Sequence, residues 1–418
     1  MRTLAEWLEL HESVHAKSID MDLARVGQVA DALALRPVPY RVITVGGTNG
    51  KGSTVAHLTA LLGALGVHTG AFTSPHLLRY NERIRIDGAE ACDSELITAF
   101  ERIESARGST TLTFFEYNTL AALLIFAARG VRAAVLEVGL GGRLDATNLI
   151  DADVAVLASV GMDHRDYLGD DLESIGREKA GIFRSGRPAV LGSAAMPASV
   201  FAAIAALGAR ALIAGRDFSW QRDGERWSYQ GVAQYANLPP SALPGAIQYR
   251  NAATAIAALE ALALPQRLDR ERIASALSQV RLAGRFQILA GPVEWILDVA
   301  HNEPAALVLA RHLQERPVAG RTIAVASILR DKDVAAIGRA LSAQIDCWIL
   351  CTLGGARGSQ ASELASRLAS IGVANVELAN SVAEGCMLAR TQARGGDRVL
   401  VFGSFPVVGT ALEWLRLY

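Results

Sequence analysis

The chain has 418 residues, which exceeds the roughly 250–300 residues at which one hydrophobic core stops growing, so two domains are expected. Its 41 Lys and Arg residues balance 42 Asp and Glu residues, which argues against the basic surface that binds nucleic acids and anionic membranes and favours a small-molecule substrate. The four cysteines form no C-x-x-C pair or dense framework, as is typical of proteins in the reducing cytoplasm.

The N-terminal segment predicts a short helix and not a signal peptide. Thr3 and Glu6 have the spacing of a capping box, and acidic residues interrupt any continuous apolar stretch. Asp20 and Asp22 then precede an amphipathic run that extends to about Leu35, so either carboxylate could cap a second helix.

The first functional pattern lies at residues 45–54, with the sequence V-G-G-T-N-G-K-G-S-T. A strand-like run enters it and an apolar-periodic helix leaves it, which is the order of a phosphate-binding loop. Such a loop turns backbone N–H groups toward the phosphates of ATP, and Lys51 adds a positive charge. The spacing departs from G-x-x-x-x-G-K-[ST], which weakens a plain kinase or GTPase interpretation; the alternative is a Gly-rich turn with an incidental Lys. The candidate ATP-binding residues are Thr48, Asn49, Gly50, Lys51, Gly52 and Ser53, and Lys51 is also a candidate catalytic residue.

Three polar side chains follow predicted strands. Ser74, Glu137 and His164 each lie at or just after the end of one. The run 132–138 is apolar enough for a parallel strand buried on both faces, and a carboxylate there is costly unless it meets a cation. Ligands bind at the carboxyl ends of parallel strands, although a Ser-Pro turn and a surface His would need no ligand.

Two later segments predict peripheral elements. The run 193–215 is long and nearly uncharged, but Pro197, Gly208 and Arg210 interrupt it, so we expect a soluble helix and a strand, not a membrane span. Residues 218–229 alternate about an Asp-Gly turn and predict a hairpin.

Beyond residue 284 the pattern becomes a regular alternation of strands and helices, and we place the domain boundary between 284 and 285. Such βαβ units imply a smaller Rossmann-like sheet with helices on both faces, and no G-x-G-x-x-G dinucleotide signature accompanies it. The expected elements are strands at 295–299, 322–327, 347–351 and 399–403, and helices at 304–313, 334–343 and 361–370.

Ordered motifs along nearly the whole chain resemble those of a known family. They are G-T-N-G-K-G-S from 47, S-P-H-L-x-x-x-N-E-R-I from 74, T-x-F-E-x-x-T from 113, E-V-G-L-G-G-R-L-D-A-T-N from 137, D-H-x-x-x-L-G from 163 and E-K-A-G-I from 178. Together they resemble the folylpolyglutamate synthase and dihydrofolate synthase branch of the Mur ligase superfamily, of the bacterial bifunctional type. The resemblance implies an α/β fold, with an N-terminal P-loop domain that has a mostly parallel sheet and a smaller C-terminal Rossmann-like domain. It implies that residues 1–284 bind ATP and pterin or folate, and that 285–418 contribute to ATP and glutamate binding.

The activity that this resemblance implies is that of an ATP-dependent amide ligase. ATP would phosphorylate a substrate carboxylate, and the amino group of L-glutamate would attack the resulting acyl phosphate. Dihydropteroate and reduced folates would be the acceptors. The alternatives are a folylpolyglutamate synthase alone, another Mur-type amino-acid ligase, or a P-loop switch or phosphotransferase that forms no amide. The S-P-H-L and L-G-G-R-L-D-A-T-N motifs point away from the peptidoglycan-precursor ligases.

The resemblance also assigns roles in the N-terminal part. Ser74, Glu137 and His164 become candidate Mg²⁺ ligands, since Mg²⁺ keeps several waters and takes few protein donors. Lys179 would be carbamylated by CO₂, which would turn a cation into an anionic oxygen donor beside the metal, and is a candidate catalytic residue. Asn251 resembles an adenine contact, although it could equally be an ordinary polar residue in a helix's first turn. The pterin or folate site would comprise Asp20, Met21, Asp22, Thr113, Phe114, Phe115, Glu116, Leu144, Asp145 and Ala146, with Phe115 stacked on the pterin ring.

In the C-terminal part, the resemblance implies nucleotide and glutamate contacts. Arg285, in G-R-F-Q, would reach the ATP phosphates, and Asp298 would contact the nucleotide. His301 would face the incoming glutamate as a catalytic and binding residue. Ser404, in the closing G-S-F, would join the glutamate site.

Two features of this part stay open. The family usually has D-x-A-H-N-P, so Glu303 leaves the backbone path before Pro304 undefined. The Asp331-Lys332-Asp333 motif also matches the family, but the sequence assigns it no chemistry.

The expected cofactors are ATP, Mg²⁺ at two sites and, as a further candidate, K⁺. We expect a cytoplasmic monomer that acts on dihydropteroate, reduced folates and L-glutamate and has neither a nucleic-acid nor a membrane partner.

Overall fold

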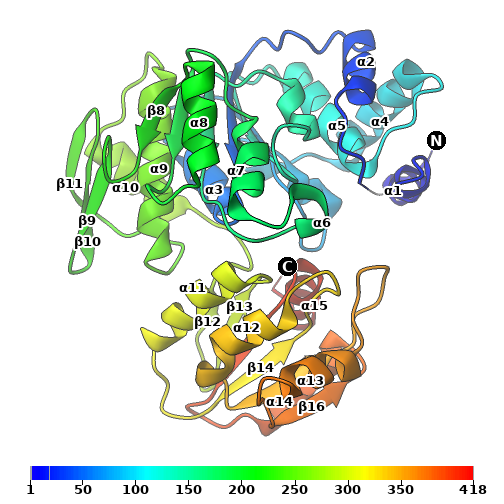
Figure 1. Ribbon diagram of the computed structural model, residues 1–418, viewed down its shortest axis with the longest axis vertical. Coiled ribbons are helices and arrows are strands. Elements are labelled where there is room, and N and C mark those ends of the chain that lie inside the picture. The colour runs from blue at the N-terminus through cyan, green and yellow to red at the C-terminus, as the bar shows by residue number, and fades with distance from the viewer. Residues whose placement is uncertain (1, 18, 418) are drawn as a thin grey trace. The chain divides into compact units, whose positions relative to one another are not determined.

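The computed structural model describes residues 2–17 and 19–417 and divides into two compact units (Figure 1). The first comprises residues up to Gly161, Arg165–Ala242 and Gln248–Val280. The second comprises Met162–His164, Leu243–Ile247 and the chain from Arg281 onward. An α/β fold with two units was predicted, and both sheets confirm it.

The first unit is built on an eight-stranded sheet of order β4-β3-β2-β5-β1-β6-β7-β8. The strands β3 and β4 are antiparallel to their neighbours, and the other pairings are parallel. The strands are β1 (Arg41–Gly46), β2 (Thr69–Phe72), β3 (Ile84–Ile86), β4 (Ala89–Glu90), β5 (Ala133–Glu137), β6 (Val154–Leu157), β7 (Pro188–Leu191) and β8 (Arg210–Ile213).

Successive residues of a strand point to opposite faces, and this alternation builds a core on each side of the sheet. Val42 and Leu136 pack with one group of helices, whereas Ile43 and Val135 pack with another. The first group is α1 (Leu4–Ser13), α2 (Ala24–Ala32), α4 (Asp93–Arg107) and α5 (Phe114–Arg129); the second is α3 (Lys51–Ala64), α9 (Ile247–Leu262) and α10 (Arg270–Gln279). The central strands are therefore apolar on both faces.

Three helices and a small sheet complete this unit. The helices are α6 (Arg165–Leu168), α7 (Leu172–Ala180) and α8 (Ala198–Leu207). The predicted hairpin is confirmed as part of a three-stranded antiparallel sheet of β9 (Ser219–Asp223), β10 (Arg226–Gln230) and β11 (Gln234–Leu238). The uncharged run 193–215 forms α8 and β8, as predicted, and no helix of the described residues is long and apolar enough to cross a membrane.

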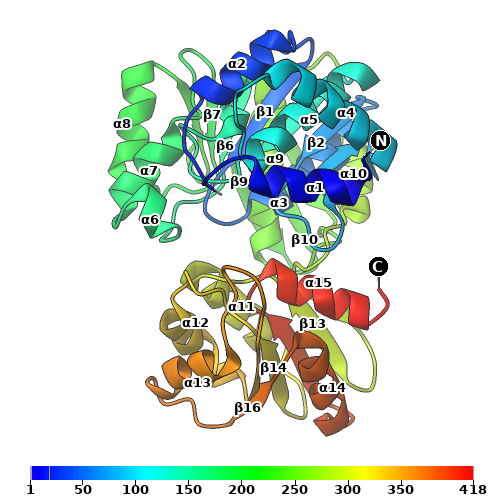
Figure 2. The ribbon, with the colours of Figure 1, turned by 90° about the vertical axis from the view of Figure 1, so that its right-hand side faces the viewer.

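The second unit contains a six-stranded sheet of order β12-β13-β17-β14-β15-β16, in which only β12 is antiparallel to its neighbour. Its strands are β12 (Gln287–Leu289), β13 (Glu294–Asp298), β14 (Thr322–Ala326), β15 (Cys347–Cys351), β16 (Val376–Ala379) and β17 (Arg398–Phe402). Its helices α11 (Glu303–Gln314), α12 (Val334–Leu341) and α13 (Ala361–Ala369) share one core, and α14 (Val382–Gln392) and α15 (Phe405–Trp414) cover the other face (Figure 2).

The change from one unit to the next falls at Val280/Arg281, four residues before the predicted boundary. Gly284 already contacts the second unit: its carbonyl accepts from the N–H of Val299, just after β13, at 2.9 Å, and its N–H donates to the side chain of Gln287 in β12 at 3.0 Å. The sequence also gave no sign that Met162–His164 and Leu243–Ile247 group with the second unit.

The cap of α2 differs from the predicted one. Leu23 occupies the N-cap position, and Asp22 instead accepts a hydrogen bond from the Ala24 N–H at 2.9 Å. Asp20 is held by Arg25 at 2.8 Å. The capping box of Thr3 and Glu6 on α1 is confirmed.

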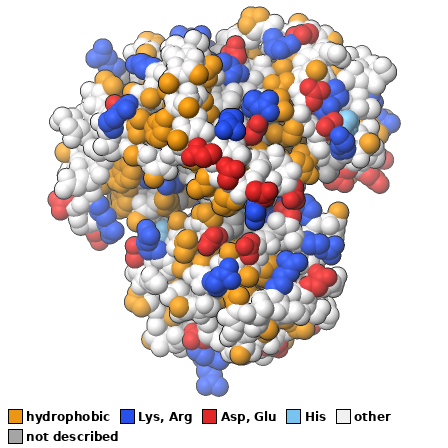
Figure 3. All heavy atoms as spheres, viewed as in Figure 1, with side chains coloured by type: hydrophobic (Ala, Val, Ile, Leu, Met, Phe, Trp, Pro, Cys, Tyr) orange, Lys and Arg blue, Asp and Glu red, His pale blue; other side chains and the backbone are white. Residues whose placement is uncertain are grey.

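Surface charge and cysteine placement agree with the composition. Acidic and basic side chains are interspersed over the face drawn in Figure 3. All four cysteines are free thiols; Cys92 is exposed and the other three are buried.

An aromatic cluster fixes α1 to the first unit. The His11 ring stacks on Tyr117 with centroids 3.8 Å apart, and meets Phe100 edge-on at 4.5 Å. Its side chain is 1% exposed, and neither ring nitrogen has a hydrogen-bond partner among the described residues. Burial lowers the pKa of His11 to about 4, so the folded protein holds this ring neutral.

Acidification should therefore weaken the first unit through His11. The pKa of this group is lower in the folded chain, so its contribution to stability is complete above pH 6.5 and is lost as the pH falls toward 4. At about 1.4 kcal/mol per pKa unit, the loss is on the order of 3 kcal/mol. His11→Phe, which keeps an aromatic ring, should show a smaller loss of unfolding free energy between pH 6.8 and 4.5 in urea titrations.

The partly exposed His68 provides the control, since the hydrogen bond that its ring donates to the Asp87 carboxylate raises its pKa. His68→Gln should not reduce the acid-dependent loss. Equal losses in the wild type and in His11→Phe would contradict the assignment.

Candidate active site

The loop after β1 has the geometry of a phosphate-binding loop. Gly47 has a φ of +142°, and a Cβ there would lie 3.1 Å from the Ser159 backbone nitrogen. The Thr48 N–H donates to the Ser159 carbonyl at 2.9 Å, and the Thr48 hydroxyl is 3.0 Å from both the N and the O of Gly161. The chain after β6 thus fixes the path of the loop.

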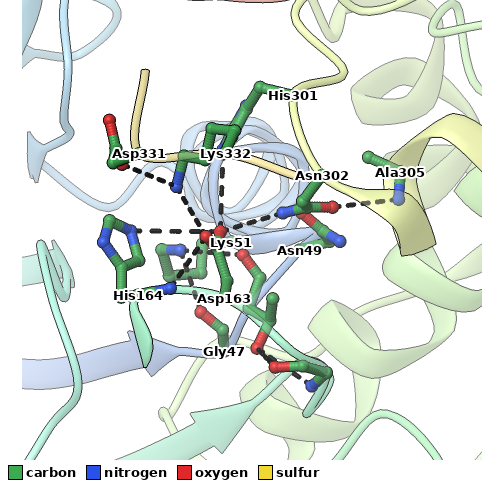
Figure 4. Close-up of polar contacts among 12 residues, drawn as sticks. Gly47, Asn49, Lys51, Asp163, His164, His301, Asn302, Ala305, Asp331 and Lys332 are labelled. Carbon is green, nitrogen blue, oxygen red and sulfur yellow. Dashed lines mark hydrogen bonds and ion pairs between the residues drawn. The ribbon is translucent and has the colours of Figure 1, made fainter. Parts of the chain in front are cut away.

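The loop ends at Gly50, whose left-handed φ of +86° starts α3. The Lys51 ammonium donates to the carbonyls of Gly47 at 2.9 Å and Thr48 at 3.2 Å (Figure 4), so it lies over its own loop. A helix N-terminus, inward-turned amides and a Lys are together a site for phosphate groups. The predicted ATP-binding residues 48–53 are therefore contiguous on this loop and the first turn of α3.

Asn251 lies beside this loop, on α9. A Cβ on Gly50 would be 3.2 Å from the Asn251 side-chain oxygen, and the Asn251 amide donates to Gln248 at 3.0 Å. The predicted adenine contact is thus close to the phosphate loop.

The predicted metal ligands Ser74 and Glu137 lie together at the carboxyl ends of β2 and β5. Glu137 is 4% exposed, and the Ser74 N–H is 3.4 Å from its carboxylate. Arg83 is close enough for its charge to interact with Glu137, which offsets the cost of burying a carboxylate. A hydroxyl and one carboxylate fit a hard ion that keeps several waters. Among the described residues, no three His, Cys, Asp and Glu side chains form a metal cluster by themselves.

The three predicted substrate segments converge within the first unit. Arg25 joins two of them, because its guanidinium donates to Asp20 at 2.8 Å and to Glu116 at 3.2 Å. Glu116 also forms a capping box with Thr113 at the start of α5. Its carboxylate, whose pKa is raised by burial, therefore already has protein partners.

The loop after β5 packs against the other two segments through glycines. A Cβ on Gly139 would lie 2.6 Å from the Phe115 ring, and one on Gly141 would lie 3.3 Å from the Met21 methyl group. Only residues without a side chain allow these approaches. Phe115 also packs on Phe72 at 5.6 Å between ring centroids.

Asp145 fixes the conformation of this loop. One carboxylate oxygen accepts from the Thr147 N–H at 3.0 Å and hydroxyl at 2.6 Å, and the other accepts from the Leu140 N–H at 2.8 Å. Burial raises the pKa of Asp145. Ala146 is buried at the start of a 3₁₀ turn, and Leu144 is partly buried. Phe114 packs beside Tyr80 at 6.0 Å.

The loop after β5 also packs against the end of α7, which carries Lys179. The Arg143 N–H donates to the Glu178 carbonyl at 2.8 Å, and the two side chains form an ion pair at 2.9 Å. Lys179 is 4% exposed. The Lys179 side chain is therefore not part of a solvated helix face.

The second unit places Asp298, Arg285 and His301 around the end of β13. Asp298 accepts from the Phe286 N–H at 2.7 Å and the Ala300 N–H at 2.8 Å; burial raises its pKa, and Arg285 opposes this. The Arg285 guanidinium lies 5.1 Å from the centroid of the Phe405 ring, and the His301 ring lies 6.1 Å from it.

Phe405, in the G-S-F motif, was not singled out from the sequence, but its ring is the shared neighbour of Arg285 and His301. Its neighbour Ser404 is buried at the N-cap position of α15, 3.4 Å from the Ser327 carbonyl.

An acidic centre at Asp163 connects His301 with His164 in the second unit (Figure 4). Lys332 Nζ is 2.5 Å from one carboxylate oxygen, and the Asn302 amide donates to the other at 2.9 Å. Nε2 of His301 and Nε2 of His164 lie 3.8 and 3.9 Å from that second oxygen. Burial raises the pKa of Asp163, but the nearby His164, Lys332 and His301 outweigh it and hold the pKa well below its usual value.

The structure thereby gives the Asp331-Lys332-Asp333 motif a role. Lys332 neutralises Asp163, Asp331 pairs with Arg357 at 2.8 and 3.0 Å, and Asp333 caps α12. Sequence reasoning missed the first of these contacts, because the partners are 169 residues apart.

Glu303 does not disturb the backbone between Asn302 and Pro304. Asn302 caps α11, and Glu303 is simply the first residue of the helix, followed by Pro304 in its first turn. Pro is well tolerated there.

Comparison with known proteins finds two matching family models. The Mur ligase middle domain matches residues 45–259, and the Mur ligase glutamate ligase domain matches residues 284–405.

Whole-chain similarity extends to curated and solved relatives. The dihydrofolate synthase/folylpolyglutamate synthase of Escherichia coli strain K12 is 43% identical, over 98% of this chain and 95% of that protein. The protein of the same name from Haemophilus influenzae is 41% identical, over 97% and 96%. The solved structure of E. coli FolC in complex with DHPP and ADP covers 100% of this chain and 98% of its own, with 42% identity and a TM-score of 0.94. A bifunctional folylpolyglutamate synthase/dihydrofolate synthase with Mn, AMPPNP and L-glutamate bound covers the same shares, with 41% identity and a TM-score of 0.92.

Removal of the Lys332 charge should destabilise the second unit strongly. Lys332→Met would leave Asp163 buried without its nearest cation, and the loss of one partner of a buried pair costs about 3 kcal/mol. The measurement is the unfolding free energy from urea titrations at neutral pH.

Arg357→Met is the matched control, because the side chain of Arg357 is 55% exposed in its pair with Asp331. It should cost less than about 1 kcal/mol. If Lys332→Met is no more destabilising than this control, the ion pair between Lys332 and Asp163 does not stabilise the fold.

Proposed function

This chain belongs to the dihydrofolate synthase/folylpolyglutamate synthase family of the Mur ligases, and we propose from that membership that it joins L-glutamate to dihydropteroate and to reduced folates at the expense of ATP. One structural observation carries the proposal beyond family membership. The phosphate loop, the Ser74 and Glu137 pair and the three converging substrate segments all belong to one unit.

The reaction has two steps. A carboxylate oxygen of the pteroate or folate attacks the γ-phosphorus of ATP, and ADP leaves with the electron pair of the broken P–O bond. The amino nitrogen of glutamate then attacks the acyl carbon, inorganic phosphate leaves, and the nitrogen loses a proton as the amide forms. Both steps require the compensation of negative charge on phosphoryl oxygens.

The residues of the first unit have separate tasks in this scheme. Residues 48–53 would bind the phosphates through backbone N–H groups, and Lys51 would turn from its own carbonyls toward the outer phosphates. Asn251 would contact the adenine. Mg²⁺, for which Ser74, Glu137 and His164 are the candidate ligands, would neutralise phosphate charge; a second Mg²⁺ and a K⁺ are part of the same proposal.

The second unit would act on nucleotide and amino acid. Arg285 would pair with phosphate oxygens, and Asp298 would contact the nucleotide. The Val299 carbonyl accepts from Nδ1 of His301 at 2.8 Å, which places the proton on Nδ1 and leaves Nε2 as the ring atom that would face glutamate. Ser404 would contribute to the same subsite. These roles would divide the chain into an ATP- and folate-binding part and a smaller part for ATP and glutamate.

The pterin subsite would lie where Met21, Phe115 and the loop 139–146 meet. Phe115 would stack on the pterin ring, and its position against Gly139 keeps it in one orientation. Backbone groups of residues 20–22, 113–116 and 144–146 would supply polar contacts.

Lys179 would act as a carbamate. Its burial places the amine away from bulk water, and CO₂ would react with the neutral form of this amine. The partners would be small molecules, and we expect a monomer in the cytoplasm.

A ligation assay tests the function directly. With ATP, Mg²⁺ and glutamate, the purified chain should convert dihydropteroate to dihydrofolate and tetrahydrofolate to its diglutamate, with one ADP per amide. Glu137→Gln should lower both rates by at least about 100-fold and keep the wild-type circular dichroism spectrum.

Three results would contradict the proposal, and each would indicate a different function. Extension of tetrahydrofolate without use of dihydropteroate would leave a folylpolyglutamate synthase alone. Activity only on a UDP-sugar would indicate a peptidoglycan-precursor ligase. ATP turnover without glutamate and without amide would indicate a phosphotransferase.

Lys179→Ala should lose most of the ligation activity, because it removes the anionic oxygen donor. Acetate or formate should restore part of it by filling the space of the carbamate, and should not stimulate the wild type. Lys179→Arg, which keeps the positive charge, is the matched variant and should not be rescued. Full activity of Lys179→Ala, or a tryptic peptide whose Lys179 remains unmodified after carbamate trapping, would contradict carbamylation.

A further inference from the structure

Arg250 is a partly buried cation without a counter-charge. It lies in the first turn of α9, and its guanidinium makes no hydrogen bond or ion pair to any described residue. Other Arg side chains of low exposure do have partners: Arg25 binds Asp20 and Glu116, and Arg398 binds Glu294. Burial is also the one cause that lowers the pKa of Arg250, with no carboxylate to oppose it.

Such an arrangement is costly unless an anion completes it. A guanidinium stays charged at every physiological pH, and a charge removed from water without a partner loses hydration free energy. Side chains in this state are commonly ligand-binding groups. The surroundings of Arg250 therefore indicate which anion its guanidinium binds.

The phosphate loop is the nearest candidate. Nη2 of Arg250 lies 3.5 Å from the place that a Cβ on Gly50 would take, and the side-chain oxygen of Asn251 lies 3.2 Å from the same place. Gly50 is the residue at which the loop becomes α3. The backbone of Arg250 is fixed there, because its carbonyl accepts from the Thr254 hydroxyl at 2.8 Å within α9.

We propose that Arg250 is a second cation of the nucleotide site, and that its guanidinium donates hydrogen bonds to phosphate oxygens of the bound nucleotide. This rests on the proposed function and adds a residue to it. Lys51 is a compact point charge that now binds the carbonyls of Gly47 and Thr48, whereas Arg250 offers a planar fork that can contact two oxygens at once. The two cations would hold the polyphosphate from different elements, α3 and α9.

The test compares nucleotide affinity in the full chain with Mg²⁺ present. Arg250→Met keeps most of the apolar stem and removes the charge, and it should raise the dissociation constant of ADP about 10- to 30-fold in calorimetric titrations. Arg250→Lys keeps the charge without the fork and should give a smaller increase. Inorganic triphosphate should show the same order of variants, whereas adenosine should bind all three proteins alike.

Stability without ligand separates this role from a structural one. Removal of an unpaired charge should leave the melting temperature of the ligand-free protein unchanged or raise it, while the ADP-induced increase becomes smaller than in the wild type. A structural residue would lower the melting temperature and leave the ADP-induced increase intact. Arg222→Met is the matched control, because Arg222 packs on the neighbouring Tyr249 at 5.8 Å and is exposed; it should not change ADP binding.

Several results would overturn the proposal. Arg250→Met that binds ADP as tightly as the wild type would show that Arg250 does not bind the phosphates. An equal loss of affinity for adenosine would show that Arg250 contacts the adenosine part of the nucleotide instead. These results are distinct from those that would contradict the proposed ligase activity. If the chain binds ADP through Arg250 but joins glutamate to neither acceptor, the ligase activity is wrong and the assignment of Arg250 stands.

Discussion

The parallel pairing of β1 with both β5 and β6 is the constraint on which the first unit depends. Val45 is in register with Glu137, and Gly46 is in register with Leu157. Because parallel strands end at the same edge of a sheet, the three loops that follow must share that edge. The phosphate loop, Glu137 and the segment Ala158–Gly161 are therefore neighbours, and contacts such as Thr48 to Ser159 follow from the register.

A second level of organisation comes from acidic side chains that hold loops in place. Asp145 accepts hydrogen bonds within its own loop, Glu116 closes the start of α5, and Asp20 is paired with Arg25. Each was expected to face a substrate, and each has partners in the protein. The shape of the predicted pterin site is thus set by these carboxylates, and its surface is completed by Phe115 and the glycine-containing loop that packs on it.

Sequence reasoning succeeded where a signal was local. The strand before the phosphate loop, the buried strand that ends at Glu137 and the alternating strands of the second unit all follow from periodicity. It failed where the cause was tertiary: Lys332 meets Asp163 across 169 residues, and Arg25 joins two segments 91 residues apart. The helix cap at Leu23 was also missed, because Asp22 accepts from the Ala24 N–H and Asp20 pairs with Arg25.

The second unit is discontinuous along the chain, because it includes Met162–His164 and Leu243–Ile247. A gene fragment that begins at Arg281 would encode every strand of its sheet but omit Asp163, the partner of the buried Lys332. Recombination at a single crossover point near Arg281 would therefore not transfer this unit intact. The region of the gene that encodes residues from 281 onward therefore has to be inherited together with the region that encodes Met162–His164, the segment after β6.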